Sequence, residues 1–134
     1  PSLGAWTSWT PSLTNATQGN GTLDFKYCQI GKRVKCRGVF TYQSTSTVSG
    51  AITISLPVTA ASPNTRQSVG HFTIYDAGTR MFYGVVQLQS TTTAWGRYFN
   101  VSGSTMDDAA VSATTPMTWA AGDQWMVDFE YEAA

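Results

Sequence analysis

The chain has 134 residues, which is long enough to bury one hydrophobic core and too short for two domains. Hydrophobic residues make up 42% of it, whereas only 12% are charged, about half the usual share. Eight basic and eight acidic residues cancel, so no net field attracts nucleic acid or an acidic membrane. No apolar run approaches the ~20 residues of a membrane span. The scarcity of titratable groups disfavours an ordinary acid–base enzyme.

Short runs of alternating apolar and polar residues, separated by turn residues about every 8 to 12 positions, predict an all-β fold. No segment has a sustained helical period. Strands are predicted at 23–28, 33–40, 51–56, 68–75, 81–89, 94–101 and 125–131. Turns are predicted at 19–21, 49–50, 62–64, 76–78 and 122–123. We expect residues 1–134 to form a single domain, a two-sheet antiparallel sandwich of jelly-roll type, with residues 1–11 as an N-terminal arm or linker.

The first hairpin can be predicted residue by residue. Its two-residue loop, Gly31-Lys32, has glycine first, which suits a type II′ turn. The register that this turn sets places Phe25 opposite Gly38 and gathers the large apolar side chains of both strands on one face. A slip of one residue would break this agreement, so the register is strongly specified.

The same register decides between a disulfide and free thiols for the two cysteines. Cys28 and Cys36 are eight residues apart, a spacing that invites a disulfide. In the predicted register Cys36 faces the core beside Tyr27, whereas Cys28 lies on the other face opposite Lys35. Side chains on opposite faces of a sheet cannot reach disulfide geometry, so both thiols are predicted to be free. We expect no metal site and no cofactor, because four ligands with zinc spacing are missing.

The charges are balanced in number but unevenly spread along the chain. Five basic residues lie in the first hairpin: Lys26, Lys32, Arg33, Lys35 and Arg37. Four acidic residues lie near the C-terminus: Asp123, Asp128, Glu130 and Glu132. We favour the interpretation that the last strand lies beside the hairpin and that these charges pair across the strands. The alternative is a basic patch for a phosphate-rich ligand such as teichoic acid.

No candidate catalytic residue stands in a catalytic motif. His71 is the only histidine, and no serine or cysteine motif gives it a nucleophile to activate, so a structural or exposed role is expected. Asp107 and Asp108 are adjacent and are predicted to form a solvated turn. A small carbohydrate-active enzyme using Asp107 or Asp128 is the weakest of the functions considered.

Aromatic residues are more numerous than one core of this size needs, with five Trp, six Tyr and six Phe. In the strand at 94–101, alternation sends Trp95 and Phe99 to one face and Tyr98 to the other. Aromatic faces stack on sugars, so Trp95, Arg97 and Tyr98 are candidate ligand-binding residues. Contact between subunits explains the same surplus and is the favoured alternative.

Several segments together resemble a known family. They are GAWTSWTP at 4–11, GNGT at 19–22, YCQIGK at 27–32, SLPVTAA at 55–61, TPMTWAAGD at 115–123 and YEAA at 131–134. The combination resembles a β-sandwich domain that recurs at the C-termini of tailed-bacteriophage tail, fibre and other virion proteins, especially in phages of actinobacteria. The resemblance runs from residue 4 to residue 134.

The resemblance implies a jelly-roll-like sandwich that forms a homotrimer on the virion exterior and assembles in the cytoplasm of the host bacterium. Its partners would be itself, other virion proteins and a host cell-wall polysaccharide, with no nucleic acid and no membrane insertion. The expected function is therefore a non-enzymatic receptor-binding head domain that contacts surface glycans. The alternative is a capsid decoration or head-spike protein with a purely structural role.

Overall fold

The computed structural model describes residues 4–62 and 66–134, and within them ten strands and no helix occur. Every strand pair is antiparallel, so the all-β prediction is confirmed. The strands are β1 (Thr7–Trp9), β2 (Leu13–Thr17), β3 (Thr22–Ile30), β4 (Arg33–Thr41), β5 (Thr47–Ser55), β6 (Ser68–Asp76), β7 (Arg80–Leu88), β8 (Thr93–Ser102), β9 (Thr105–Ala110) and β10 (Gln124–Glu132).

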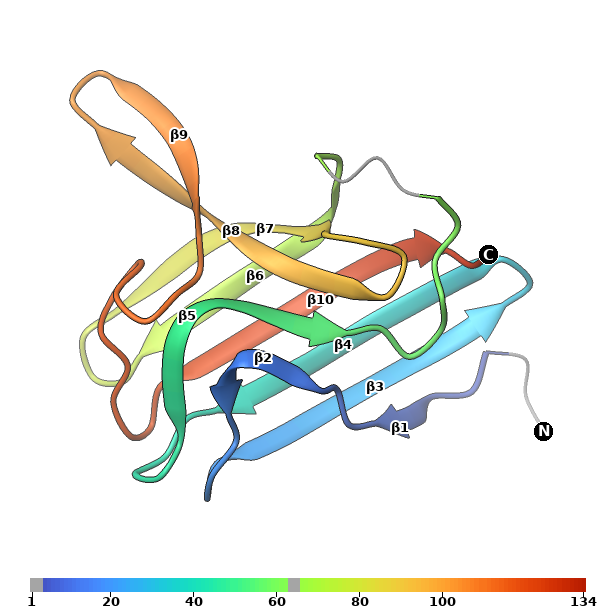
Figure 1. The fold of residues 1–134 in the computed structure, drawn as a ribbon, viewed down its shortest axis with the longest axis horizontal. Helices are drawn as coiled ribbons and strands as arrows, with labels where there is room; N and C mark the ends of the chain where they lie inside the picture. The colour runs from blue at the N-terminus through green and yellow to red at the C-terminus, as the bar shows by residue number, and fades with distance from the viewer. Residues whose placement is uncertain (1–3, 63–65) are drawn as a thin grey trace.

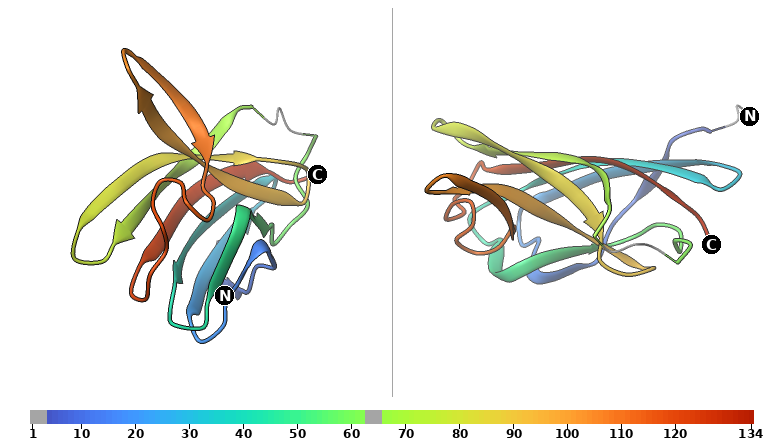
Figure 2. Two further views of the ribbon diagram at one scale, coloured as in Figure 1. Left: turned by 60° about the vertical axis from the view of Figure 1, so that its left-hand side comes forward. Right: turned by 90° about the horizontal axis from the view of Figure 1, so that it is seen from above.

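All ten strands belong to one continuous sheet that curls into a half-barrel (Figure 1). Nine strands follow in the order β1-β3-β4-β10-β6-β7-β8-β5-β2, and β9 pairs with β8 off this path. The curl brings the β5–β2 end over the β3–β4 end, so the ribbon has two layers when seen from above (Figure 2). Side chains of β5 and of β3–β4 therefore share one core, as Ile52 and Phe25 do.

The last strand, β10, lies at the centre of this core. Trp125, Val127, Phe129 and Tyr131 alternate along it and are all buried, as the sequence predicts. Large aromatic side chains bury the most apolar area per residue, so β10 contributes heavily to the hydrophobic stabilisation of the fold. Its neighbours are β4 on one side and β6 on the other.

The predicted register of the first hairpin is confirmed over all nine pairs of β3 and β4. Gly31 has a φ of 59°, as the first position of a type II′ turn requires. Gly38 lies against Phe25: a Cβ added to Gly38 would be 2.1 Å from the ring atom Cδ2. Cys36 is buried in the core and Cys28 lies opposite Lys35, and both are free thiols.

Three strands were not predicted from the sequence, namely β1, β2 and β9. β1 pairs with β3, so the segment Thr7–Trp9 of the expected N-terminal arm belongs to the sheet. The prediction of a turn at 49–50 was wrong, because these residues continue β5, whose pairing with β2 shifts register between Thr14 and Ala16. The predicted turn at 62–64 falls largely outside the described residues. The turns at 19–21, 76–78 and 122–123 are confirmed.

The prediction of a solvated turn at Asp107 and Asp108 was also wrong. Both residues lie within β9, where they pair with Asn100 and Phe99 of β8. The local sequence of β9 has no alternation and few β-favouring residues, and only its pairing with β8 makes it a strand.

The outer ends of β8 and β9 project from the sheet as a two-stranded hairpin (Figures 1 and 2). The last pair of β8 with β7 is Tyr98 with Gly84, so residues 99–108, which we call the β8–β9 arm, extend beyond the part of β8 that pairs with β7. Three large apolar side chains of the arm are exposed: Phe99 by 41%, Val101 by 69% and Met106 by 67%.

One carboxylate, that of Asp123, is buried, with only 1% of the residue exposed. Its Oδ1 accepts a hydrogen bond from Ala77 N at 2.9 Å, and its Oδ2 accepts one from Ala120 N at 2.7 Å. These bonds tie the β6–β7 turn to the loop before β10. Asp123 is therefore a structural residue.

Candidate functional site

The predicted ligand-binding strand, β8, contributes two of its three candidate residues to one surface hollow. Trp95 and Arg97 line it together with Gln87, Gln89, Asp108 and Arg66. The hollow has a volume of about 640 Å³. The register of β7 with β8 places Gln87 directly opposite Trp95, and β9 brings Asp108 beside Arg97. We call Gln87, Gln89, Trp95, Arg97 and Asp108 the Trp95 site.

Arg97 is held between an aromatic ring and a carboxylate. Its Cζ lies 4.8 Å from the centroid of the Trp95 ring, and its Nε donates to Asp108 Oδ2 at 2.7 Å. The hydrogen bond from Arg97 holds the pKa of Asp108 below its ordinary value, so this carboxylate is ionised at neutral pH. The two charges cancel, and the site carries a fixed polar pair beside an apolar ring.

The two glutamines keep polar atoms available for a ligand. Gln87 Nε2 donates to the Arg66 carbonyl at 3.3 Å, and Gln89 Oε1 accepts from Thr93 Oγ1 at 3.1 Å. Within the described residues no hydrogen bond uses Gln87 Oε1 or Gln89 Nε2, so an acceptor oxygen and a donor amide nitrogen remain. Trp95 Nε1 is buried, so the indole meets the hollow through its carbon atoms.

Tyr98, the third predicted residue, does not join this site. It lies on the opposite face of β8, where its ring packs edge-on against Phe82 at a centroid distance of 5.8 Å. The alternation that separates Trp95 from Tyr98 was visible in the sequence. Gln87, Gln89 and Asp108 were missed, because only the pairing of β8 with β7 and β9 brings them to Trp95.

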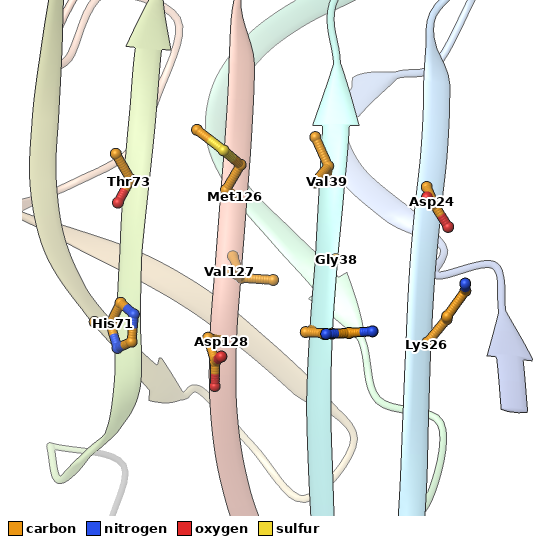
Figure 3. Close-up of a pocket in the computed structure, with 10 residues that line it drawn as sticks. Asp24, Lys26, Gly38, Val39, His71, Thr73, Met126, Val127 and Asp128 are labelled. Atoms are coloured by element: carbon orange, nitrogen blue, oxygen red, sulfur yellow. The ribbon is translucent and has the colours of Figure 1, made fainter. Parts of the chain in front are cut away.

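A second hollow of about 420 Å³ lies on the outer face of β3, β4, β10 and β6 (Figure 3). Its lining includes one cross-strand row in register, formed by Lys26, Arg37, Asp128 and His71. A second row consists of Asp24, Val39, Met126 and Thr73. We call this hollow the outer groove. His71 is exposed there, as the sequence analysis expects.

The favoured interpretation of the uneven charges is confirmed, because β10 lies beside the hairpin and pairs with it. Arg33 Nε contacts Glu130 Oε1 at 2.9 Å, and Lys35 forms an ion pair with Asp128. The hydrogen bond from Arg33 lowers the pKa of Glu130. These side chains are largely solvated, so each pair adds at most a modest stabilisation.

Residues 4–62 and 66–134 contain no group of three or more His, Cys, Asp or Glu side chains that could hold a metal ion. Searched over the same ranges, the structure has no helix of the length and hydrophobicity that a membrane span needs. The Cys36 thiol is unreactive at neutral pH, because burial raises its pKa to about 12.

Comparisons with protein-family models, with curated proteins and with solved structures found no match.

Proposed function

We propose that this chain is a non-enzymatic virion protein of a tailed bacteriophage, and that its Trp95 site binds a glycan of the bacterial surface. The observation that carries the glycan proposal is an indole ring at an open hollow, flanked by an arginine–carboxylate pair and two amides. The virion assignment is supported by the family resemblance of the sequence.

Sugars combine an apolar face of C–H groups with a rim of hydroxyls. The Trp95 ring suits the face, and the unused amide atoms, Gln87 Oε1 and Gln89 Nε2, suit the hydroxyls. The Arg97–Asp108 pair cancels its own charge, so this pair does not by itself select a charged ligand. Because Arg97 is already held by two neighbours, binding loses little side-chain entropy there.

We also propose the finer architecture that the resemblance implies, a jelly-roll-like sandwich that forms a homotrimer on the virion exterior after assembly in the host cytoplasm. The β8–β9 arm supports association, because a lone two-stranded hairpin is marginally stable in water and this one exposes Val101 and Met106. A trimer would also multiply a weak single-site affinity through avidity.

The test is binding of the purified protein to host cell-wall polysaccharide, measured for the wild type and for Trp95→Ala. We expect the variant to bind about fivefold more weakly, because a stacking contact of about 1 kcal/mol corresponds to about fivefold in affinity. Tyr83→Ala is the matched control, since Tyr83 is an exposed aromatic residue of β7 outside the site. Unchanged binding by Trp95→Ala, or no binding by the wild type at about millimolar ligand, would refute the proposal.

A purely structural role as a capsid decoration or head-spike protein is the second candidate, and the exposed arm is the observation that favours it. The double substitution Val101→Ser and Met106→Ser separates the two functions. If capsid binding is lost while polysaccharide binding is absent throughout, the structural role is supported. If the double variant still binds polysaccharide and the wild type never binds capsids, the receptor-binding role is supported.

A further inference from the structure

The ion pairs between β4 and β10 are displaced from the register of the backbone. In register, Arg37 lies opposite Asp128 and Lys35 lies opposite Glu130. The ion pairs instead join Lys35 to Asp128 and Arg33 to Glu130. Each of these two basic side chains thus pairs with the acidic residue that lies two positions before its register partner on β10. Asp128, the residue opposite Arg37, is therefore paired with Lys35 instead.

Arg37 and Lys26 lie directly opposite each other on β4 and β3. Like charges in this position destabilise a sheet. Arg37 is stacked on Trp6, with its Cζ 4.6 Å from the ring centroid, which holds the guanidinium in place. Within the described residues neither cation makes an ion pair. The fold thus tolerates a repulsive pair at the outer groove, and an anion bound between the two charges would relieve it.

The rest of the outer groove defines what kind of anion fits. The side chains of Lys26, Asp128 and His71 lie in one row, and those of Asp24 and Thr73 lie in the next (Figure 3). Asp128 is already neutralised by Lys35 and so opposes an anion less than a free carboxylate would. Asp24 and Thr73 can accept hydrogen bonds from hydroxyl groups. A phosphate that carries neighbouring hydroxyls matches this mixture.

We propose that the outer groove binds the phosphate of a polyol phosphate ester, with Lys26 and Arg37 as its cationic ligands and with Asp24 and Thr73 facing the hydroxyls. The groove is lined by β3, β4, β10 and β6, whereas the Trp95 site is built on β7, β8 and β9. This inference does not depend on the glycan proposal. The same chemistry occurs in a free polyol phosphate and in a repeating polyol-phosphate polymer of a cell wall.

The experiment is calorimetric or NMR titration of the whole protein with glycerol 3-phosphate, with glycerol as the uncharged control. We expect saturable binding of glycerol 3-phosphate that weakens at least about fivefold in Lys26→Gln and in Arg37→Gln, since each loses a charge-assisted contact. Lys32→Gln is the matched control: it removes the same charge from the turn of the same hairpin, outside the groove. Its affinity should stay within about twofold of the wild type, because exposed charges at a distance are screened.

A second measurement separates a binding role from a structural one. Without ligand, Lys26→Gln should melt no lower than the wild type, because it removes the like charge that lies opposite Arg37 in the register. A clear fall in melting temperature would show that Lys26 supports the fold, and would overturn the argument from repulsion. Absence of saturable binding at about 10 mM glycerol 3-phosphate, or equal weakening by Lys32→Gln, would overturn the proposed site.

Two further measurements identify the source of the ligand and separate the outer groove from the Trp95 site. Tighter binding of poly(glycerol phosphate) than of the monomer would assign the groove to a wall polymer, and equal binding per phosphate would assign it to a free polyol phosphate. Trp95→Ala should bind glycerol 3-phosphate like the wild type. Loss of binding in that variant would show that the two hollows are not independent, contrary to the proposal.

Discussion

Replacing Gly38 with alanine tests whether the core depends on the close approach of β4 to the Phe25 ring. A Cβ at position 38 would lie 2.1 Å from Cδ2 and 2.3 Å from Cγ of Phe25. Real Cβ atoms do not approach other atoms so closely, so the ring has to move. Its room is limited, because Phe25 is buried and Trp9 packs edge-on against it at a centroid distance of 5.1 Å.

The loss of folding free energy in Gly38→Ala follows from these contacts. Overpacking a core typically costs about 1 to 3 kcal/mol, and the rigid surroundings of Phe25 place Gly38→Ala near the upper end, at about 3 kcal/mol. With an unfolding entropy of about 2.1 cal/mol/K per residue, a chain of this length should lose about 10 °C in melting temperature. A loss of about 3 kcal/mol is a large part of the free energy of unfolding of a typical domain, about 5 to 15 kcal/mol.

The assay is calorimetric or urea unfolding of Gly38→Ala, Phe25→Leu, their double variant and Gly50→Ala. Gly50→Ala is the control, since the nearest atoms to its added Cβ, those of Asn15, lie 3.4 Å away. It should melt within about 2 °C of the wild type. Combining Gly38→Ala with Phe25→Leu should recover part of the loss, because the smaller side chain makes room, and the double-mutant cycle measures this coupling. A Gly38→Ala protein that melts like Gly50→Ala would refute the reasoning.

Three other predictions concern buried polar groups. Asp123→Ala should lower the free energy of unfolding in urea by about 2 to 4 kcal/mol, because two backbone N–H groups lose a charged acceptor that is itself buried. Tyr131→Phe should cost about 1 to 2 kcal/mol in the same assay, because its hydroxyl donates to the Val58 carbonyl at 2.6 Å. Burial raises the pKa of Cys36 from 9.0 to about 12, so its contribution to stability is full below pH 9 and is lost as the pH rises towards 12. At about pH 8 a thiol reagent should therefore label Cys28 and spare Cys36 in the native protein.

Each of these predictions has a result that would contradict it. For the carboxylate, a stability loss below about 1 kcal/mol in Asp123→Ala would mean that water replaces both hydrogen bonds. For the tyrosine, equal stability of Tyr131→Phe would show that the Val58 carbonyl finds another donor. For the thiols, equal labelling of both cysteines under native conditions would place Cys36 outside the core.

The sequence by itself determined the local pairing of this protein. Alternation along β3, β4 and β10 separated core from outer residues, and Gly31 marked the turn that sets the hairpin register. These features depend on neighbours a few residues apart and on the period of a strand, so a pattern along the chain carries them. The free state of Cys28 and the burial of Cys36 followed from the same register.

Tertiary structure alone decided the order of the strands and the composition of both hollows. β9 and the edge strands β1 and β2 are short or weakly patterned, and partners elsewhere in the chain make them strands. Trp95 and Arg97 could be singled out from the sequence, but Asp108 reaches Arg97 only through the β8–β9 pairing. Contacts of this kind depend on which distant strands hydrogen-bond to one another. That choice is made by burying a shared apolar face, and no local pattern records it.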